Sequence, residues 1–217
     1  MRDNGAMHVL PRRLLVIPIA LVVGLLAACG GSESGQVETA PLYSGIVRTP
    51  PPAVDGTPLP DVANADAPTP LRGQGDDEIL LVMFGFTTCP DICPTTLADL
   101  RTALKDLPPD LRSRTRVAMI TVDPKRDTPA KLTRYLHAFF PDGIPLRTTD
   151  DATLQKVAKD FAAAYQVNKG ANGKPEVIHS AFTYAIGPDG RLLVQWPFGT
   201  PADVMTHDLR VALDAVA

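Results

Sequence analysis

Two cysteines, Cys89 and Cys93, lie four residues apart in the segment 84–94, which reads FGFTTCPDICP. An apolar run ends just before them and a helical pattern begins just after, so we expect both thiols at the N-terminus of a helix. The partial positive charge there should lower the thiol pKa and favour thiolate, the form that binds metal. A spacing of four places both sulfurs on one side of a helical turn. Two soft sulfurs favour Cu(I), zinc or an iron–sulfur cluster, but the cluster would need two further cysteines.

The same pair has a plainer interpretation as a structural disulfide. A bridge that closes so short a loop adds little stability, so a chemical role is favoured. The chain holds three cysteines, and an exported protein with an odd thiol needs an explanation for it. Lipidation of the third, Cys29, would leave Cys89 and Cys93 as one pair. Outside the reducing cytosol, this pair can be oxidised to a redox disulfide.

The elements that must position these thiols follow the pattern of an α/β domain. Residues 79–86 (ILLVMFGF) and 117–122 (VAMITV) are continuous apolar runs of strand length, as in strands buried on both faces of a sheet. Between them, leucines recur at helical spacing until Pro108-Pro109 ends the helix. Four later elements are expected: a helix from 127–129, a helix from 150 through Tyr165, a hairpin over 182–196 and a helix from Pro201. This order predicts a mixed central sheet flanked by helices.

Length and charge narrow the class of protein. A chain of 217 residues with 45% hydrophobic side chains is long enough for one domain plus additional segments. Its formal charge is −3, and its lysines and arginines form no cluster. A nucleic-acid-binding protein would carry a basic patch, so we expect no nucleic-acid partner.

The N-terminus has the pattern of an export signal. Arg12 and Arg13 precede an apolar run over residues 14–28, which is short for a membrane span because about 20 residues are needed. A positive flank, a short apolar region and small residues at the exit are typical of a secretory signal peptide. The ending Leu-Ala-Ala-Cys resembles a bacterial lipobox, which would make Cys29 the lipidated first residue of the mature protein. A plain cleaved signal and an uncleaved anchor are the alternatives.

Composition predicts three segments. Residues 1–28 are the lipoprotein-type signal peptide, residues 29–42 a flexible tether of small and polar residues, and residues 43–217 the folded domain. Residues 41–70 hold eight of the 22 prolines, and residues 54–59 (VDGTPL) are typical of a strand, a turn and a second strand. We therefore expect an ordered N-terminal extension that packs against the domain.

Three motifs in the same order resemble the Sco/SenC family, copper proteins with a thioredoxin-like fold. Residues 84–94 are similar to the family's CxxxC signature, residues 122–129 (VDPKRDTP) to its VDPxRDTP motif, and residues 179–190 to its HSA and Y-x-I-x-P-x-G segment. The resemblance covers roughly residues 43–217. The sequence departs from it at Thr88, where many relatives have a bulkier residue, so the surroundings of the site differ.

The resemblance implies a ligand set for copper, as Cu(I), Cu(II) or both. Cys89 and Cys93 would supply thiolates and His179 an imidazole. Asp123 matches an acidic position near the site, where it would have a supporting role. The alternative for Asp123 is that it caps the turn after its strand.

The remaining histidines of the domain are weaker candidates. His137 and His207 fall off the apolar faces of their helices and are expected in solvent. Thioredoxin-type oxidoreductases pair CxxC with a facing cis-proline, whereas this chain has His179-Ser180 at the corresponding loop. Two sulfurs and one nitrogen suit copper, while zinc would prefer a fourth ligand.

The function implied by the resemblance is that of a copper chaperone, exported and held by a lipid anchor on the extracytoplasmic side of the cell membrane. It would deliver copper to the copper centre of cytochrome c oxidase during assembly, or reduce the cysteines of that centre. Its partner would be the copper-bearing subunit of the oxidase or another copper protein. Two alternatives are a thiol–disulfide oxidoreductase that uses Cys89 and Cys93, and a copper-responsive sensor. Redox exchange does not require an imidazole, so His179 discriminates between the first two.

Overall fold

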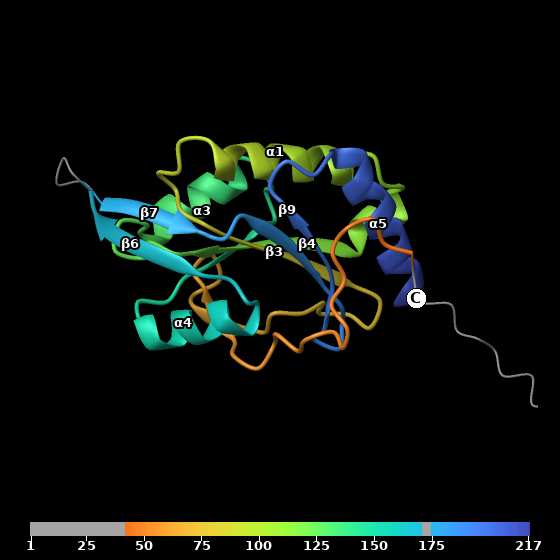
Figure 1. Cartoon of the computed structure of the whole chain (residues 1–217), viewed down its shortest axis with the longest axis horizontal. Helices are drawn as coiled ribbons and strands as arrows, with labels where there is room; N and C mark the ends of the chain where they lie inside the picture. The colour runs from red at the N-terminus through yellow and green to blue at the C-terminus, as the bar shows by residue number, and fades with distance from the viewer. Residues whose placement is uncertain (1–41, 171–174) are drawn as a thin grey trace, which may run out of the picture. The chain divides into compact units, whose positions relative to one another are not determined.

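A computed structural model describes residues 42–170 and 175–217 (Figure 1). The predicted signal peptide, Cys29 and all but the last residue of the predicted tether lie outside these residues. The central sheet has seven strands. In spatial order they are β2 (Ala67–Thr69), β1 (Leu59–Asp61), β5 (Ile144–Leu146), β4 (Thr115–Thr121), β3 (Ile79–Gly85), β8 (Phe182–Ile186) and β9 (Leu192–Pro197). Strands β3, β4 and β5 run parallel and the others antiparallel to their neighbours, so the predicted mixed sheet is confirmed.

Helices cover both faces of this sheet, with α1 and α4 on opposite sides in Figure 1. The helices are α1 (Ile92–Lys105), α2 (Pro109–Ser113), α3 (Pro129–His137), α4 (Asp151–Asp160) and α5 (Ala202–Ala215). The predicted apolar face of α1 is confirmed, because Leu97, Leu100 and Leu104 are all buried. None of the helices in the described part of the chain has the length and hydropathy of a membrane span.

Strand β3 is the strand that positions the cysteines, and all seven of its residues are buried. The Phe84 ring packs edge-on against Phe161, with centroids 5.5 Å apart, and against Tyr184 at 6.2 Å. Burial of one such side chain contributes about 1.5–3 kcal/mol. Side chains alternate along a strand, so Gly85 faces the opposite side of the sheet, where α1 begins. The aromatic cluster therefore fixes the end of β3 from which the cysteine loop leaves.

An N-terminal strap, residues 42–58, is ordered against the domain as predicted. Ile46 forms a β-bridge with Gln195 of β9. The amides of Ser44 and Gly45 donate to the carboxylate of Asp208 at 2.7 and 2.8 Å. Trp196 donates its indole N–H to the same carboxylate at 2.7 Å. The buried Asp208 therefore joins the strap, β9 and α5.

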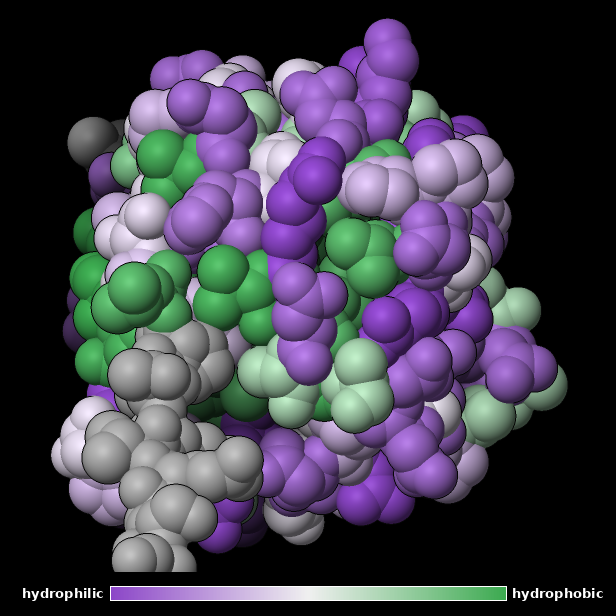
Figure 2. All heavy atoms as spheres, turned by 90° about the vertical axis from the view of Figure 1, so that its right-hand side faces the viewer, coloured by the Kyte–Doolittle hydropathy of each residue, from purple (hydrophilic) through white to green (hydrophobic). Residues whose placement is uncertain are grey.

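Figure 2 shows the side of the molecule on which the strap and the C-terminal end of α5 lie. Apolar residues gather near the middle of this face, between hydrophilic ones. A cleft of about 470 Å³ lies between the strap and the chain end, where Tyr43, Val47, Leu192 and Val216 line it. This cleft is at the opposite end of β9 from the loop that follows His179.

The structure corrects the expected helix from 150 through Tyr165. Helix α4 ends at Asp160, and Ala162 has φ +51°, a left-handed conformation that cannot continue a helix. Tyr165 begins instead the strand β6 (Tyr165–Lys169), which pairs with β7 (Pro175–His179) in a two-stranded antiparallel ribbon. The ribbon was not predicted, because its exposed strands lack a clear apolar alternation.

Three smaller differences concern short elements. The predicted strand–turn–strand at residues 54–59 is confirmed in part. The chain bends at residues 56–57 and β1 begins at Leu59, but a single β-bridge at Ala53 stands in place of the first strand. Strand β5 and helix α2 were not predicted. Each spans only three to five residues, too few for hydrophobic periodicity to indicate.

Candidate metal centre

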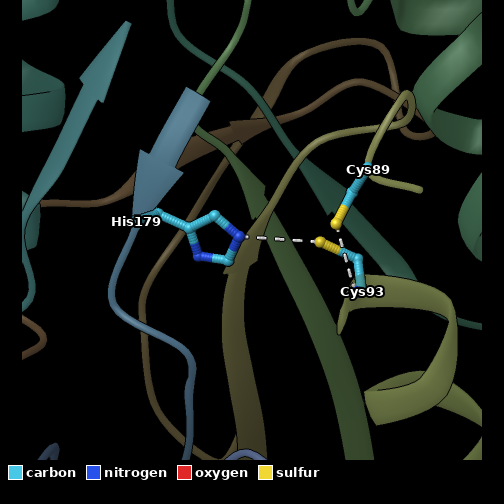
Figure 3. A group of neighbouring side chains, drawn as sticks. All are labelled: Cys89, Cys93 and His179. Carbon is cyan, nitrogen blue, oxygen red and sulfur yellow. Dashed lines mark hydrogen bonds between the residues drawn. The ribbon is translucent and has the colours of Figure 1, made fainter. Parts of the chain in front are cut away.

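Three side chains from separate elements meet at one end of β3 (Figure 3). Cys89 lies in the loop between β3 and α1, Cys93 in the first turn of α1, and His179 at the end of β7. The two sulfurs and an imidazole nitrogen all lie within 4.8 Å of one another. The structure therefore brings together the three residues that the sequence predicted as ligands.

The spacing of the two cysteines had predicted that they share a helical turn, and this prediction is wrong. Helix α1 begins at Ile92 with Asp91 as its N-cap, so Cys89 precedes the helix. The amide of Cys93 nevertheless donates to Sγ of Cys89 at 3.3 Å. This amide is one of the free N–H groups of the first helical turn. The helix N-terminus thus faces the sulfur of Cys89, as expected.

The Cys93 thiol departs from the sequence-based expectation in its acidity. Both cysteines are free thiols, and Cys93 is fully buried. Burial raises the pKa of Cys93 well above its usual range, and the hydrogen bond with Cys89 and the negative charges of Cys89 and Asp127 raise it further. The predicted lowering by the helix N-terminus is therefore wrong for Cys93. Desolvation of the charged form outweighs the helix dipole here.

Gly85 leaves the space that the Cys93 sulfur occupies. A methyl group added at Gly85 would lie 3.1 Å from Sγ of Cys93 and 2.8 Å from the terminal carbon of Met119. Both distances are shorter than ordinary van der Waals contact. The last residue of β3 must therefore be small for Cys93 to point at the centre.

Hydrogen bonding fixes the tautomer of His179. Its Nδ1 lies 3.0 Å from the carbonyl oxygen of Ser180, which can only accept, so Nδ1 carries the proton. The lone pair of Nε2 then points at Sγ of Cys93, 3.7 Å away (Figure 3). Burial lowers the pKa of His179, although the Ser180 carbonyl partly opposes this. The imidazole is thereby kept neutral, and Nε2, the nitrogen that a metal would bind, faces the two sulfurs.

Two side chains, those of Arg126 and Phe86, lie between Asp123 and the His179 imidazole. Its buried carboxylate pairs with Arg126, whose guanidinium lies 6.0 Å from the centroid of the Phe86 ring. The Phe86 ring packs edge-on against the His179 imidazole, with centroids 5.9 Å apart. The backbone carbonyl of Asp123 also closes the turn after β4 by accepting from Arg126 and Asp127. The Asp123 carboxylate thus pairs with Arg126, and its supporting role at the centre stays a prediction.

Two residues near the centre were not predicted from the sequence. Asp127 is fully buried and bonds to Thr87, two residues before Cys89. Its place in the VDPKRDTP motif was the available signal. Tyr135 on α3 has a buried hydroxyl without a hydrogen-bond partner among the described residues. Burial raises its pKa, as do the negative charges of Cys93 and Cys89, and no sequence pattern indicated it.

The other histidines are outside the cluster. Nε2 of His137 donates to the carbonyl of Gly143 at 3.0 Å, so this side chain is half-buried and bonded rather than solvated as predicted. His207 is exposed, in agreement with the prediction. Among the residues that the structure describes, the group able to hold a metal is the one formed by two sulfurs and one nitrogen.

The chemistry of this donor set fits copper. Thiolate and imidazole are the ligands that Cu(I) and Cu(II) share with zinc. A structural zinc site normally has four protein ligands. In the described part of the chain, no further histidine, cysteine or carboxylate joins the two cysteines and His179. The two sulfurs and one nitrogen therefore fit copper and do not form a closed structural zinc site, whereas an open zinc site has the same number of protein ligands.

Comparisons with known proteins agree with the fold and the motifs. A family model described as SCO1/SenC matches residues 72–214. A SCO2-like protein of Rickettsia conorii is 36% identical over 152 residues, 69% of this chain and 70% of that protein. A relative from Stutzerimonas stutzeri is 38% identical over 112 residues, which is 52% of this chain but only 54% of the relative.

Solved structures of Sco proteins superpose on this chain. Apo Sco1 of Thermus thermophilus superposes with a TM-score of 0.64 at 33% identity, over 82% of this chain and 99% of that one. Bradyrhizobium japonicum ScoI, solved with copper bound, superposes with a TM-score of 0.59 at 27% identity, over 73% and 98%. The chain therefore belongs to the SCO1/SenC family and has that family's thioredoxin-like fold.

Proposed function

We propose that this protein binds copper through Cys89, Cys93 and His179 and takes part in the assembly of the copper centre of cytochrome c oxidase. The observation that supports copper most directly is the convergence of two sulfurs and one nitrogen within 4.8 Å. A relative with the same fold has been solved with copper bound. The Sco family is described as one of cytochrome c oxidase assembly proteins, which supports the choice of target.

The residues prepare this centre to accept and release copper as cargo. The Ser180 carbonyl holds the proton of His179 on Nδ1, so Nε2 is available without a tautomer change. The thiol of Cys93 must lose its proton when copper binds, because metal ligands bind as thiolates. Cys89 is half-exposed and Cys93 buried. A partner would therefore reach Cys89 first, and ligand exchange would begin there.

The decisive experiment is an anaerobic copper titration of the full-length protein in detergent. The wild type should bind one copper, and His179→Ala should bind it more weakly and with an altered spectrum. Cys89→Ala and Cys93→Ala should each abolish tight binding, since one sulfur and one imidazole make a poor soft-metal site. His207→Ala is the matched control, because His207 is exposed and outside the cluster. Wild-type protein that binds no copper would refute the proposal.

A thiol–disulfide oxidoreductase is the second candidate. Two adjacent free thiols at a helix N-terminus in a thioredoxin-like fold favour it. If His179→Ala keeps wild-type copper affinity and spectrum, while Cys89 and Cys93 still reduce a disulfide substrate, this second function replaces the first.

We further propose that export and a lipid on Cys29 hold the protein on the extracytoplasmic side of the cell membrane. The support is the Leu-Ala-Ala-Cys ending of the apolar N-terminal run. A tether over residues 29–42 would then separate the lipid from the domain. This position would give the copper centre access to a membrane-bound oxidase subunit.

A further inference from the structure

Asp127 is a buried carboxylate whose contacts point to the cysteine loop. The side chain is 0% exposed. It accepts hydrogen bonds from the backbone amide of Thr87 at 3.0 Å and from the Thr87 hydroxyl at 2.5 Å. The Thr121 hydroxyl, at the end of β4, donates at 2.6 Å. Asp127 therefore connects the end of β4 with the loop that leaves β3.

That loop carries Cys89 after a single turn. The amide of Cys89 donates to the carbonyl of Phe86 at 3.1 Å, which closes a turn over residues 86–89. Thr87 lies inside this turn, and Asp127 holds both its backbone and its side chain. The place of the Cys89 backbone thus depends on Asp127, although Asp127 makes no hydrogen bond to a cysteine in the described part of the chain.

Hydrogen bonds of its own backbone also hold Asp127 in place. Its amide donates to the carbonyl of Asp123 at 3.0 Å, and its carbonyl accepts from Nε of Arg147 at 2.8 Å. Arg147 also donates to the carbonyl of Pro124. Hydrogen bonds to Asp123 and Arg147 therefore hold the backbone of Asp127, while its carboxylate holds the loop.

The energetic cost of this arrangement argues for a role beyond packing. A buried carboxylate is expensive unless it is paired or fully hydrogen-bonded. Within the described residues Asp127 forms no ion pair, and its donors are an amide and two hydroxyls. An apolar residue could fill the same space without this cost, but it could not hold the amide of Thr87.

We propose that Asp127 is the positioning residue of the metal centre, which sets the place of the Cys89 sulfur relative to Cys93 and His179. This inference rests on the proposed function. Partners that are hydrogen-bonded directly to metal ligands typically change metal affinity by about 10-fold to 100-fold when they are removed. Asp127 acts through Thr87, so we expect a loss at or below the lower end of this range. The same geometry also sets how readily the two sulfurs form a disulfide, which offers a readout without metal.

The test compares Asp127→Asn with Asp208→Asn in the full-length protein. Asp208 is the matched control, because it is also 0% exposed and also accepts three hydrogen bonds, from Ser44, Gly45 and Trp196. Asp127→Asn should weaken copper binding by up to about tenfold and shift the Cu(II) absorption and paramagnetic resonance spectra. Asp208→Asn should destabilise the fold to a similar extent and leave affinity and spectra as in the wild type.

A second pair of variants allows the same test if Asp127→Asn does not fold. Thr87→Val removes the hydroxyl donor and should shift the spectra in the same direction, whereas Thr87→Ser keeps both donors and should restore the wild type. Wild-type spectra and affinity in both Asp127→Asn and Thr87→Val would overturn the inference. Equal changes in Asp208→Asn and Asp127→Asn would overturn it as well, since they would indicate general destabilisation.

The redox midpoint of the Cys89–Cys93 pair, measured without metal, separates this inference from the proposed function. Asp127→Asn and Thr87→Val should both shift that midpoint and Asp208→Asn should not. Thr87→Val keeps the charge of Asp127, which itself acts on the Cys93 thiol, so the shift in Thr87→Val reports the position of the loop. If the wild type binds no copper, the proposed function fails while this shift still decides the positioning role. If the wild type binds copper and neither midpoint nor spectrum changes in Asp127→Asn, the positioning role alone fails.

Discussion

Nε2 of His179 lies 3.7 Å from Sγ of Cys93, although 86 residues separate the two in the chain. The Ser180 carbonyl directs the nitrogen lone pair toward the sulfur, and burial keeps the imidazole neutral. Burial also keeps Cys93 protonated. Copper must therefore displace the Cys93 proton before both atoms can act as ligands.

The acidity of this pair predicts a pH-dependent copper affinity. The pKa of Cys93 is raised, so at neutral pH copper must displace its proton, and the apparent affinity should increase as pH rises. Each displaced proton contributes up to about tenfold per pH unit. The pKa of His179 is lowered, so this residue should not compete for a proton until the pH is below about 6.5. Competition with a Cu(I) chelator between about pH 6 and 8 measures the slope, and a flat profile would contradict the protonated state of Cys93.

The space at Gly85 predicts the effect of a single methyl group. Gly85→Ala should push the Cys93 sulfur or Met119 aside and lower the free energy of unfolding by about 1–3 kcal/mol, as overpacking in a core does. Copper affinity should fall in the same variant, because Cys93 is displaced. Gly56→Ala is the control, since nothing lies within 4 Å of the added carbon there. Denaturant unfolding and copper titration of both variants check this, and equal results for the two would show that Cys93 has room to move.

The distance between the two sulfurs predicts control by oxidation. All ligand atoms lie within 4.8 Å, so Cys89 and Cys93 can form a disulfide after a small movement. A disulfide offers no thiolate, and the oxidised protein should therefore have little affinity for copper. Reduction should restore one copper per chain. Titration of both forms, with thiols counted in each, is the measurement, and equal affinities would exclude the cysteines as ligands.

The N-terminal pattern predicts a lipid on Cys29. Two acyl chains hold a protein on a membrane far more stably than one. Cys29→Ser should therefore move the protein from the membrane fraction to the soluble fraction without changing copper binding. Cell fractionation and mass spectrometry of the mature N-terminus test this together. An unmodified Cys29 on the membrane-bound protein would show that another anchor is used.

Local sequence was sufficient for the elements that are long and strongly patterned. The continuous apolar run of β3, the leucines of α1 and the hairpin of β8 and β9 were all predicted, because burial imposes a regular spacing on such elements. The family motifs also indicated Cys89, Cys93 and His179 as one group. Short elements without periodicity, such as β5 and the ribbon of β6 and β7, were missed.

The acidity of Cys93 and the hydrogen bonds around the centre could be determined only from the tertiary structure. The helix N-terminus at Cys93 suggested an acidic thiol, but only the packed structure shows that Cys93 is fully buried and that desolvation reverses the shift. The bond from Asp127 to Thr87 spans 40 residues, and no local pattern encodes it. Periodicity reports which side chains are buried, whereas the partners of a buried polar group depend on which distant segments the fold places beside it.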